Sequence, residues 1–135
     1  MLILFVCTGN TCRSPMAAAL FSHFNPDMQT DSAGLAVVEN AACENAVLAM
    51  RELGIELSGH VPRPATAALL QAADRICCMS GAQRDTLIAA GVAKERIMVL
   101  DVADPYGGSI AAYRQCRDEL AEKIRRLQEQ GGFDS

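Results

Sequence analysis

The chain has 135 residues, which is enough for one domain with a substantial hydrophobic core. Half of the residues are hydrophobic, yet only 4% are aromatic and there is no Trp, so the core must be aliphatic and rich in alanine. The formal net charge of −4 at pH 7 argues against nucleic acid as the main partner.

The six cysteines raise the question of a disulfide-rich secreted protein. The chain shows no basic, cleavable leader, and the apolar run 2–6 is too short for a signal peptide or a membrane span. We therefore expect a cytoplasmic protein with reduced thiols and no membrane partner.

Strand-like apolar runs alternate with helical patterns along the chain. In chain order, the expected strands are 2–6, 28–34, 75–79 and 97–100, and the expected helices are 16–24, 44–53, 66–72, 83–90 and 110–127. The pair Gly131-Gly132 ends the last helix. This order predicts an α/β fold of three layers, a doubly wound, four-stranded parallel sheet with helices on both faces. Such sheets bind their ligands at the carboxyl ends of the strands.

The loop after the first expected strand carries the strongest functional signal. It reads Cys-Thr-Gly-Asn-Thr-Cys-Arg-Ser-Pro from Cys7 to Pro15 and leads into a helix. A glycine-containing turn at this place points backbone N–H groups at one spot, and the helix dipole adds positive charge there. With Cys7 at its start and Arg13 six residues later, the loop can hold a phosphate-sized anion against a nucleophile.

A second Cys-x5-Arg match runs from Cys78 to Arg84, so this spacing alone is a weak motif. Asp85 places a negative charge where an anion would have to bind. Ser80 and Gln83 also have the spacing of a capping box, which accounts for this turn without a ligand. The first 25 residues contain no acidic side chain, so we expect the first copy to be the chemical site and the second to be structural.

A further motif, Asp104-Pro105-Tyr106, lies late in the chain. Together with Cys7-x5-Arg13-Ser14 it resembles the low-molecular-weight protein tyrosine phosphatases over essentially the whole chain. Within that family, the two motifs look most like those of the bacterial protein-arginine phosphatases. The resemblance implies one phosphatase domain over 1–135, phosphorylated proteins as substrates, and a reaction that uses no metal or other cofactor.

The resemblance also assigns the catalytic roles. Cys7 is expected to attack phosphorus and form a phosphocysteine, while Arg13 binds two phosphate oxygens. Asp104 is expected to act first as general acid and then as general base. An Asp-Pro pair is also an ordinary turn starter, and the connection from the last strand is shorter than relatives commonly have. Asp101 is therefore kept as a second candidate for the acid.

Substrate binding is expected from the backbone N–H groups of the loop and from a few side chains around it. The expected substrate-binding residues are Thr8, Gly9, Asn10, Thr11, Cys12, Ser14 and Tyr106. Asn10 is expected to be left-handed, and Ser14 to donate to the thiolate, to cap the helix, or both. Thr11 stands where tyrosine-specific relatives usually carry Ile, and its hydroxyl suits the N–H groups of a guanidine leaving group, which favours phosphoarginine. Tyr106 forms an aromatic wall or packs in a partly buried position.

The remaining cysteines and histidines receive simpler interpretations. From spacing alone Cys12 packs under the loop, whereas the resemblance implies a reversible disulfide between Cys7 and Cys12 that protects the nucleophile. His60 and Arg63 are expected to organise the architecture near the site. Cys43, Cys77, Cys78 and Cys116 are expected to be ordinary core or surface residues.

Three functions besides a phosphoarginine phosphatase stay open. The first is a phosphotyrosine-specific phosphatase. The second is an arsenate reductase, which would need a relay pair on a mobile segment, whereas Cys77-Cys78 lie in a strand-like run. The third is a non-catalytic module that binds phosphorylated residues, which the presence of both Cys7 and Asp104 disfavours. The sequence does not indicate an oligomeric state.

Overall fold

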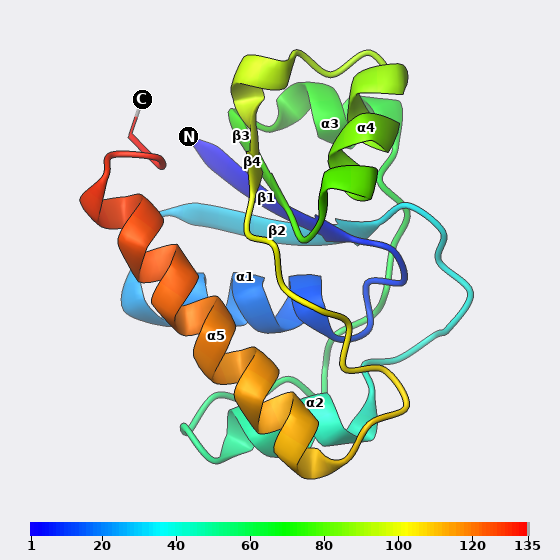
Figure 1. Ribbon diagram of the computed structural model, residues 1–135, viewed down its shortest axis with the longest axis vertical. Helices are drawn as coiled ribbons and strands as arrows, with labels where there is room; N and C mark the ends of the chain where they lie inside the picture. Colours follow the sequence, from blue (N-terminus) through cyan, green and yellow to red (C-terminus); the bar gives the residue numbers. More distant parts are fainter. Residues whose placement is uncertain (135) are drawn as a thin grey trace.

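A computed structural model describes residues 1–134, and within them four strands form one sheet in the order β2-β1-β3-β4 (Figure 1). The strands are β1 (Leu2–Cys7), β2 (Gln29–Gly34), β3 (Arg75–Cys78) and β4 (Ile97–Val99). All three pairings are parallel, which confirms the predicted sheet. The chain runs from β1 to one edge and then returns through β3 to the other. The loops after β1 and β3 therefore flank the point where the winding reverses, which is where such folds bind ligands.

Helices cover both faces of the sheet, as predicted (Figure 1). They are α1 (Arg13–Phe24), α2 (Glu44–Arg51), α3 (Ala67–Ala72), α4 (Gly81–Ala89) and α5 (Ile110–Glu129), with a 3-10 turn at Lys94–Arg96. One hydrophobic cluster joins β1 to α1, α2 and α5, and a second joins it to α3 and α4. No helix in the described part of the chain is long and apolar enough to cross a membrane.

The central strand β1 is apolar throughout because both of its faces are covered. Ile3 and Phe5 point into the cluster under α1 and α5, whereas Leu4 and Val6 point into the cluster under α3 and α4. All four side chains are fully buried. Each such burial stabilises the fold by about 1.5–3 kcal/mol.

The first helix ends at Phe24 as predicted but begins earlier than predicted. It begins at Arg13 rather than Met16, because a proline in the first helical turn has no N–H bond to lose. Met16 and Leu20 are buried, whereas Phe24, a further four residues along the helix, is 68% exposed. With 3.6 residues per turn, each four-residue step turns about 40° around the helix, so the second step carries Phe24 off the buried face.

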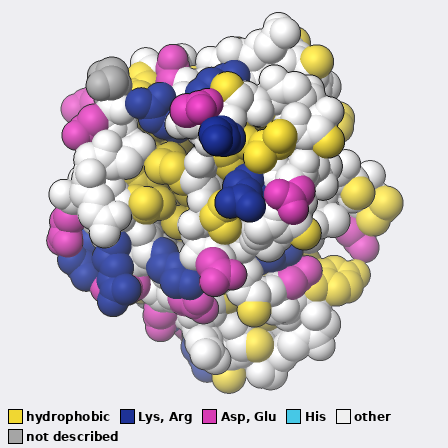
Figure 2. Space-filling model, turned by 45° about the horizontal axis from the view of Figure 1, so that its top comes forward, with side chains coloured by type: hydrophobic (Ala, Val, Ile, Leu, Met, Phe, Trp, Pro, Cys, Tyr) yellow, Lys and Arg dark blue, Asp and Glu magenta, His cyan; other side chains and the backbone are white. Residues whose placement is uncertain are grey.

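Charged side chains of both signs lie on the surface of the molecule. On the face seen in Figure 2, basic and acidic side chains are interspersed. Along α5 two i,i+4 ion pairs form, with 2.9 Å between Lys123 and Glu119 and 3.0 Å between Arg126 and Glu122. Exposed pairs of this kind contribute little to stability, because the surrounding water and salt screen them.

Candidate active site

The loop between β1 and α1 directs polar hydrogens at the sulfur of Cys7. The backbone N–H of Asn10 donates to Cys7 Sγ at 3.2 Å, and the Ser14 hydroxyl lies 2.9 Å from the same sulfur. Asn10 Nδ2 donates to Ser14 Oγ at 2.7 Å, so the Ser14 hydroxyl proton points either at the Cys7 sulfur or at the Ala33 carbonyl oxygen, 3.4 Å away. Two hydrogen-bonding groups therefore lie against one buried sulfur.

The sharp bend of the loop is made by Asn10, which has a φ of +57° and is left-handed as expected. Segments from elsewhere hold it in place. The backbone N–H of Arg63 donates to Asn10 Oδ1 at 3.0 Å, and His60 Nε2 lies 2.7 Å from the Asn10 carbonyl oxygen. Since that oxygen can only accept, a hydrogen bond between the two requires a proton on His60 Nε2. The expected architectural role of His60 and Arg63 is thus confirmed.

The end of β2 supports the loop from the side, and this requires a glycine at position 34. A Cβ atom on Gly34 would lie 2.8 Å from the carbonyl oxygen of Thr8 and 3.0 Å from Asn10 Cβ. Just beyond it, the backbone N–H of Leu35 donates to the Cys7 carbonyl at 3.0 Å. The loop is therefore fixed by backbone contacts before any ligand binds.

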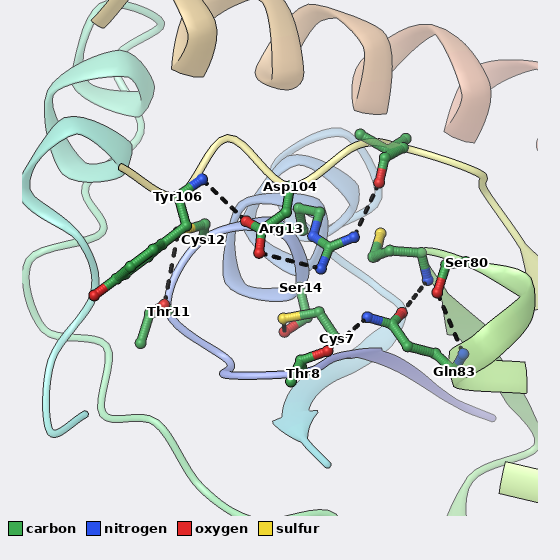
Figure 3. Close-up of polar contacts among 12 residues, drawn as sticks. Cys7, Thr8, Thr11, Cys12, Arg13, Ser14, Ser80, Gln83, Asp104 and Tyr106 are labelled. Carbon is green, nitrogen blue, oxygen red and sulfur yellow. Dashed lines mark hydrogen bonds and ion pairs between the residues drawn. The ribbon is translucent and has the colours of Figure 1, made fainter. Parts of the chain in front are cut away.

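Arg13 is buried, and its guanidinium is held on two sides (Figure 3). Nη1 donates to the carbonyl oxygen of Val102 at 3.0 Å, and Nη2 lies 3.6 Å from Asp104 Oδ2. A guanidinium fixed in this way is oriented for an anion in advance, which lysine with its single flexible ammonium cannot match.

Asp104 reaches the site despite the short connection from β4. The segment continues along the edge of the sheet, where Leu100 N–H donates to the Cys78 carbonyl and Val102 N–H to the Met79 carbonyl, both at 2.9 Å. Asp104 follows two residues later, half-exposed, with Oδ1 accepting from the Tyr106 N–H at 3.0 Å.

Asp101, the second candidate for the acid, lies outside this arrangement. It has a φ of +58°, and its carbonyl oxygen accepts from Lys123 Nζ at 2.6 Å. Its side chain does not line the cavity described next.

A cavity of about 250 Å³ opens above the loop. It is lined by Cys7, Thr8, Gly9, Thr11, Cys12, Arg13, Ala36, Val38, Glu39, Asp104 and Tyr106. All but two of the expected site residues therefore meet in one place. The two exceptions, Asn10 and Ser14, do not line the cavity and are fully buried beneath the loop, where they act on the sulfur and the bend.

Two residues of the site carry no clear signal in the sequence. Gln83 on α4 accepts at Oε1 from the Met79 N–H at 2.7 Å and donates from Nε2 to Thr8 Oγ1 at 3.1 Å (Figure 3). Only half of the predicted capping box forms, the bond from Gln83 N–H to Ser80 Oγ at 3.2 Å. The Gln83 amide braces the loop of residues 8–12 between β1 and α1 (the phosphate loop) instead of returning to Ser80.

Glu39 is the second residue without a signal. It comes from the loop after β2, lines the cavity, and accepts from the Tyr106 hydroxyl at 3.3 Å. The nearby carboxylate raises the pKa of Tyr106, because it disfavours a second negative charge. Tyr106 is 61% exposed, so its ring forms a wall at the mouth of the cavity rather than part of the core.

Within residues 1–134, no three side chains of His, Cys, Asp or Glu come together as they would around a metal ion. The polar groups of the cavity are instead two carboxylates, a guanidinium, thiols and hydroxyls. This set can bind an anion, attack it and transfer a proton.

Comparison with known proteins gives the same picture over nearly the whole chain. Residues 2–130 match the family described as low molecular weight phosphotyrosine protein phosphatase. The chain is 41% identical over 144 aligned residues to a protein-arginine-phosphatase of Bacillus subtilis (strain 168), with 95% of each chain covered. It is 33% identical to the low molecular weight protein-tyrosine-phosphatase PtpB of Staphylococcus aureus, with 96% of this chain and 98% of that one covered.

Solved structures agree. A cysteine-to-serine mutant of the YwlE arginine phosphatase with a phosphorylated active-site serine superposes with a TM-score of 0.89 at 38% identity, covering 99% of this chain and 97% of that one. A low molecular weight protein tyrosine phosphatase from T. tengcongensis gives a TM-score of 0.90 at 32% identity, covering 96% and 99%. The chain therefore belongs to the low-molecular-weight phosphotyrosine protein phosphatase family.

Proposed function

We propose that this protein is a cysteine-dependent phosphatase that removes phosphate from phosphorylated protein side chains, with phosphoarginine favoured over phosphotyrosine. One observation carries the proposal: the Cys7 sulfur, the Arg13 guanidinium and the Asp104 carboxylate line a single cavity (Figure 3). A nucleophile, an anion-binding cation and a proton donor in one place are the groups that phosphoryl transfer through a covalent intermediate requires.

The first step is transfer of the phosphoryl group to Cys7. Loop N–H groups and Arg13 bind the phosphate oxygens, and the thiolate attacks phosphorus to form a phosphocysteine. The bond to the leaving group breaks as Asp104 gives it a proton. Only Asp104 among the cavity carboxylates lies beside Arg13, at 3.6 Å, and thus next to the bound phosphate.

The second step returns the enzyme to its starting state. Asp104, now ionised, takes a proton from a water molecule that attacks the phosphocysteine. The sulfur leaves as a thiolate, and the Ser14 hydroxyl at 2.9 Å stabilises the returning charge. Inorganic phosphate is released, and the side chains of Cys7, Arg13, Ser14 and Asp104 together with one water molecule account for both steps.

Preference for phosphoarginine is supported by the acceptors around the cavity. The leaving group of phosphoarginine is a guanidine, which carries N–H donors and can carry positive charge. Thr11 Oγ1 and the carboxylate of Glu39 offer acceptors, and Glu39 adds negative charge at the mouth. The aromatic ring of phosphotyrosine would pack against the ring of Tyr106, which lines the cavity. This contact is the observation that keeps phosphotyrosine as the second candidate substrate.

Arsenate reduction and phosphate binding without turnover have less support. Cys77 and Cys78 are fully buried in β3, and burial raises the pKa of both thiols, so they do not form the mobile relay that an arsenate reductase would need. A module that only binds phosphorylated residues has no use for an acid in the same cavity as the sulfur.

A cytoplasmic location fits the six thiols, which are free within residues 1–134.

The test is phosphate release from matched phosphoarginine and phosphotyrosine peptides in the presence of a metal chelator. We expect release from both, faster from phosphoarginine, and none with the Cys7→Ser variant. Faster release from phosphotyrosine would keep the mechanism and reject the substrate preference. Release that does not depend on Cys7 would reject the mechanism itself.

A further inference from the structure

A second pair of thiols lies beside the phosphate loop, outside the proposed chemistry. Cys12 Sγ lies 2.9 Å from Sγ of Cys43, a residue 31 positions later that precedes α2. The backbones are joined next to the pair, because the Cys43 N–H donates to the Thr11 carbonyl at 3.0 Å. The two sulfurs are therefore held together by the fold and do not meet by chance rotation of long side chains.

The two thiols differ in their access to solvent. Cys12 is only 3% exposed, with the Tyr113 hydroxyl at 3.5 Å and the Thr11 hydroxyl at 3.6 Å, whereas Cys43 is half-buried. Burial, followed by the contact with Cys43, raises the pKa of Cys12 to about 12. Cys12 thus keeps its proton at neutral pH. Because Cys43 is the more exposed of the two thiols, a small oxidant reaches it first.

The sulfurs of Cys12 and Cys7 have different hydrogen-bonding partners. Within residues 1–134, the contacts of the Cys12 sulfur at hydrogen-bonding distance are Thr11, Cys43 and Tyr113, while the Cys7 sulfur is engaged by Asn10 and Ser14. A disulfide between Cys7 and Cys12 would require both sulfurs to leave these partners. A bond between Cys12 and Cys43 requires an approach of less than about 1 Å, since an S–S bond is about 2.05 Å long.

We propose that Cys12 and Cys43 form a redox-active dithiol, which peroxide converts into a disulfide that ties the phosphate loop to the start of α2 and leaves Cys7 free. The thiolate of Cys43 attacks one peroxide oxygen, the O–O bond breaks, and hydroxide leaves to take up a proton as water. Cys12 then attacks the resulting sulfenic acid. The S–S bond forms as the hydroxyl group and the Cys12 proton leave as a second water. The two thiols lose two electrons and the peroxide gains them.

The pairing decides whether the nucleophile Cys7 or a neighbouring cysteine is oxidised near the site. A Cys7–Cys12 bond would consume the nucleophile, whereas the Cys12–Cys43 bond links the loop to α2 through a residue that does not line the cavity. It also removes Cys12 as a partner for Cys7. The pair is a modification site in its own right, and it exists whether or not the phosphatase proposal holds.

The experiment maps the disulfide directly. Wild-type protein saturated with inorganic phosphate, to shield Cys7, and the Cys7→Ser variant are treated with hydrogen peroxide, alkylated and digested without reductant. Mass spectrometry is expected to find Cys12 linked to Cys43 in both samples, with Cys7 alkylated in the wild type. Alkylated Cys12 and Cys43 in the Cys7→Ser variant would overturn the proposal, as would Cys12 linked to Cys7 in the wild type.

Matched variants identify the partner. Cys43→Ser is expected to fold, because position 43 is the N-cap of α2, where serine is favoured and the thiol makes no capping bond. It should lose the link entirely. Cys116→Ala removes another buried thiol of the same hydrophobic cluster and should keep the link. A link that survives Cys43→Ser, or that disappears in a folded Cys116→Ala protein, would contradict the assignment of Cys43.

Discussion

Gln83 and Thr8, 75 residues apart, are joined by a hydrogen bond of 3.1 Å that connects α4 to the phosphate loop. The same amide accepts from the backbone N–H of Met79 at 2.7 Å. One buried side chain thus provides a hydrogen-bond partner for the backbone just after β3 and also braces the loop after β1. These are the two strands at which the winding of the sheet reverses. The position of the loop therefore depends on both halves of the fold.

We expect Gln83→Ala to lower the free energy of unfolding by about 1–3 kcal/mol, because the Met79 N–H loses its partner in a buried place. The activity that remains should show a lower kcat with a smaller change in KM, since the loop is less well positioned and the cavity walls stay. Urea unfolding and steady-state kinetics measure both effects. Gln115→Ala, at an exposed position, is the control. Equal stability of the two variants would contradict the bracing role.

The local part of the site could be predicted from the sequence because it is contiguous. One stretch after an apolar strand contains Cys7, Arg13 and the turn between them. The nucleophile, the anion-binding guanidinium and the start of the helix can therefore be recognised together. The left-handed Asn10 follows from the same stretch. Asp104 is identified through its family motif, and the structure supplies the physical reason that it reaches the cavity, the bonds along the edge of β3.

The rest of the site could not be predicted because it depends on contacts between distant segments. The spacing of Ser80 and Gln83 accounts for the start of α4, yet it does not determine where the amide of Gln83 points. Glu39 and Cys43 lie in or beside a connection with no periodic pattern, and only the folded chain places Glu39 at the cavity and Cys43 against Cys12. Tertiary packing decides these positions.

Asp104→Asn should reduce kcat by about 100- to 10,000-fold, the range expected when a general acid is removed. The defect should be smaller for substrates whose leaving group needs no proton, such as an aryl phosphate with an acidic phenol. Steady-state rates with both kinds of substrate measure this difference. Asp101→Asn is the control, since asparagine accepts the positive φ at that position and the side chain lies outside the cavity. A large loss in the Asp101 variant would return the acid role to that residue.

Thr11→Ile should shift the preference from phosphoarginine toward phosphotyrosine by about ten-fold. The reason is that an apolar ethyl group replaces the hydroxyl that accepts from the guanidine. Both side chains are β-branched, so the backbone of the loop should be retained. The ratio of kcat/KM for the two matched peptides measures the shift. Thr8→Val removes a hydroxyl that faces Gln83 and should affect both substrates alike. An unchanged ratio in Thr11→Ile would remove Thr11 from the basis of specificity.

Glu39→Gln should lower kcat/KM for phosphoarginine by about two- to five-fold and leave phosphotyrosine unchanged, since an exposed charge interaction contributes about 0.2–1 kcal/mol. The loss should shrink in high salt, because an exposed pair is screened. Glu44→Gln, which alters a carboxylate outside the cavity, is the control. Equal losses for both peptides would indicate that Glu39 acts through the Tyr106 hydroxyl and not through the guanidine.

The contact between α2 and α5 should show a distinct dependence on pH. Glu52 binds Arg114 at 2.7 Å and Arg117 at 2.8 Å, and these hydrogen bonds lower its pKa to about 2. A carboxyl whose pKa is lower in the folded than in the unfolded state stabilises the fold above its unfolded pKa, near 4.3. That stabilisation is lost as the pH falls from there toward about 2.

Glu52→Gln should therefore be less stable than the wild type at pH 7, and the difference should shrink steadily below about pH 4. Urea unfolding of both proteins across this range measures it. Glu95→Gln, on the exposed 3-10 turn, should show no such trend. A difference between Glu52→Gln and the wild type that stays constant from about pH 7 to pH 3 would mean that packing of the side chain, and not its charge, joins the two helices.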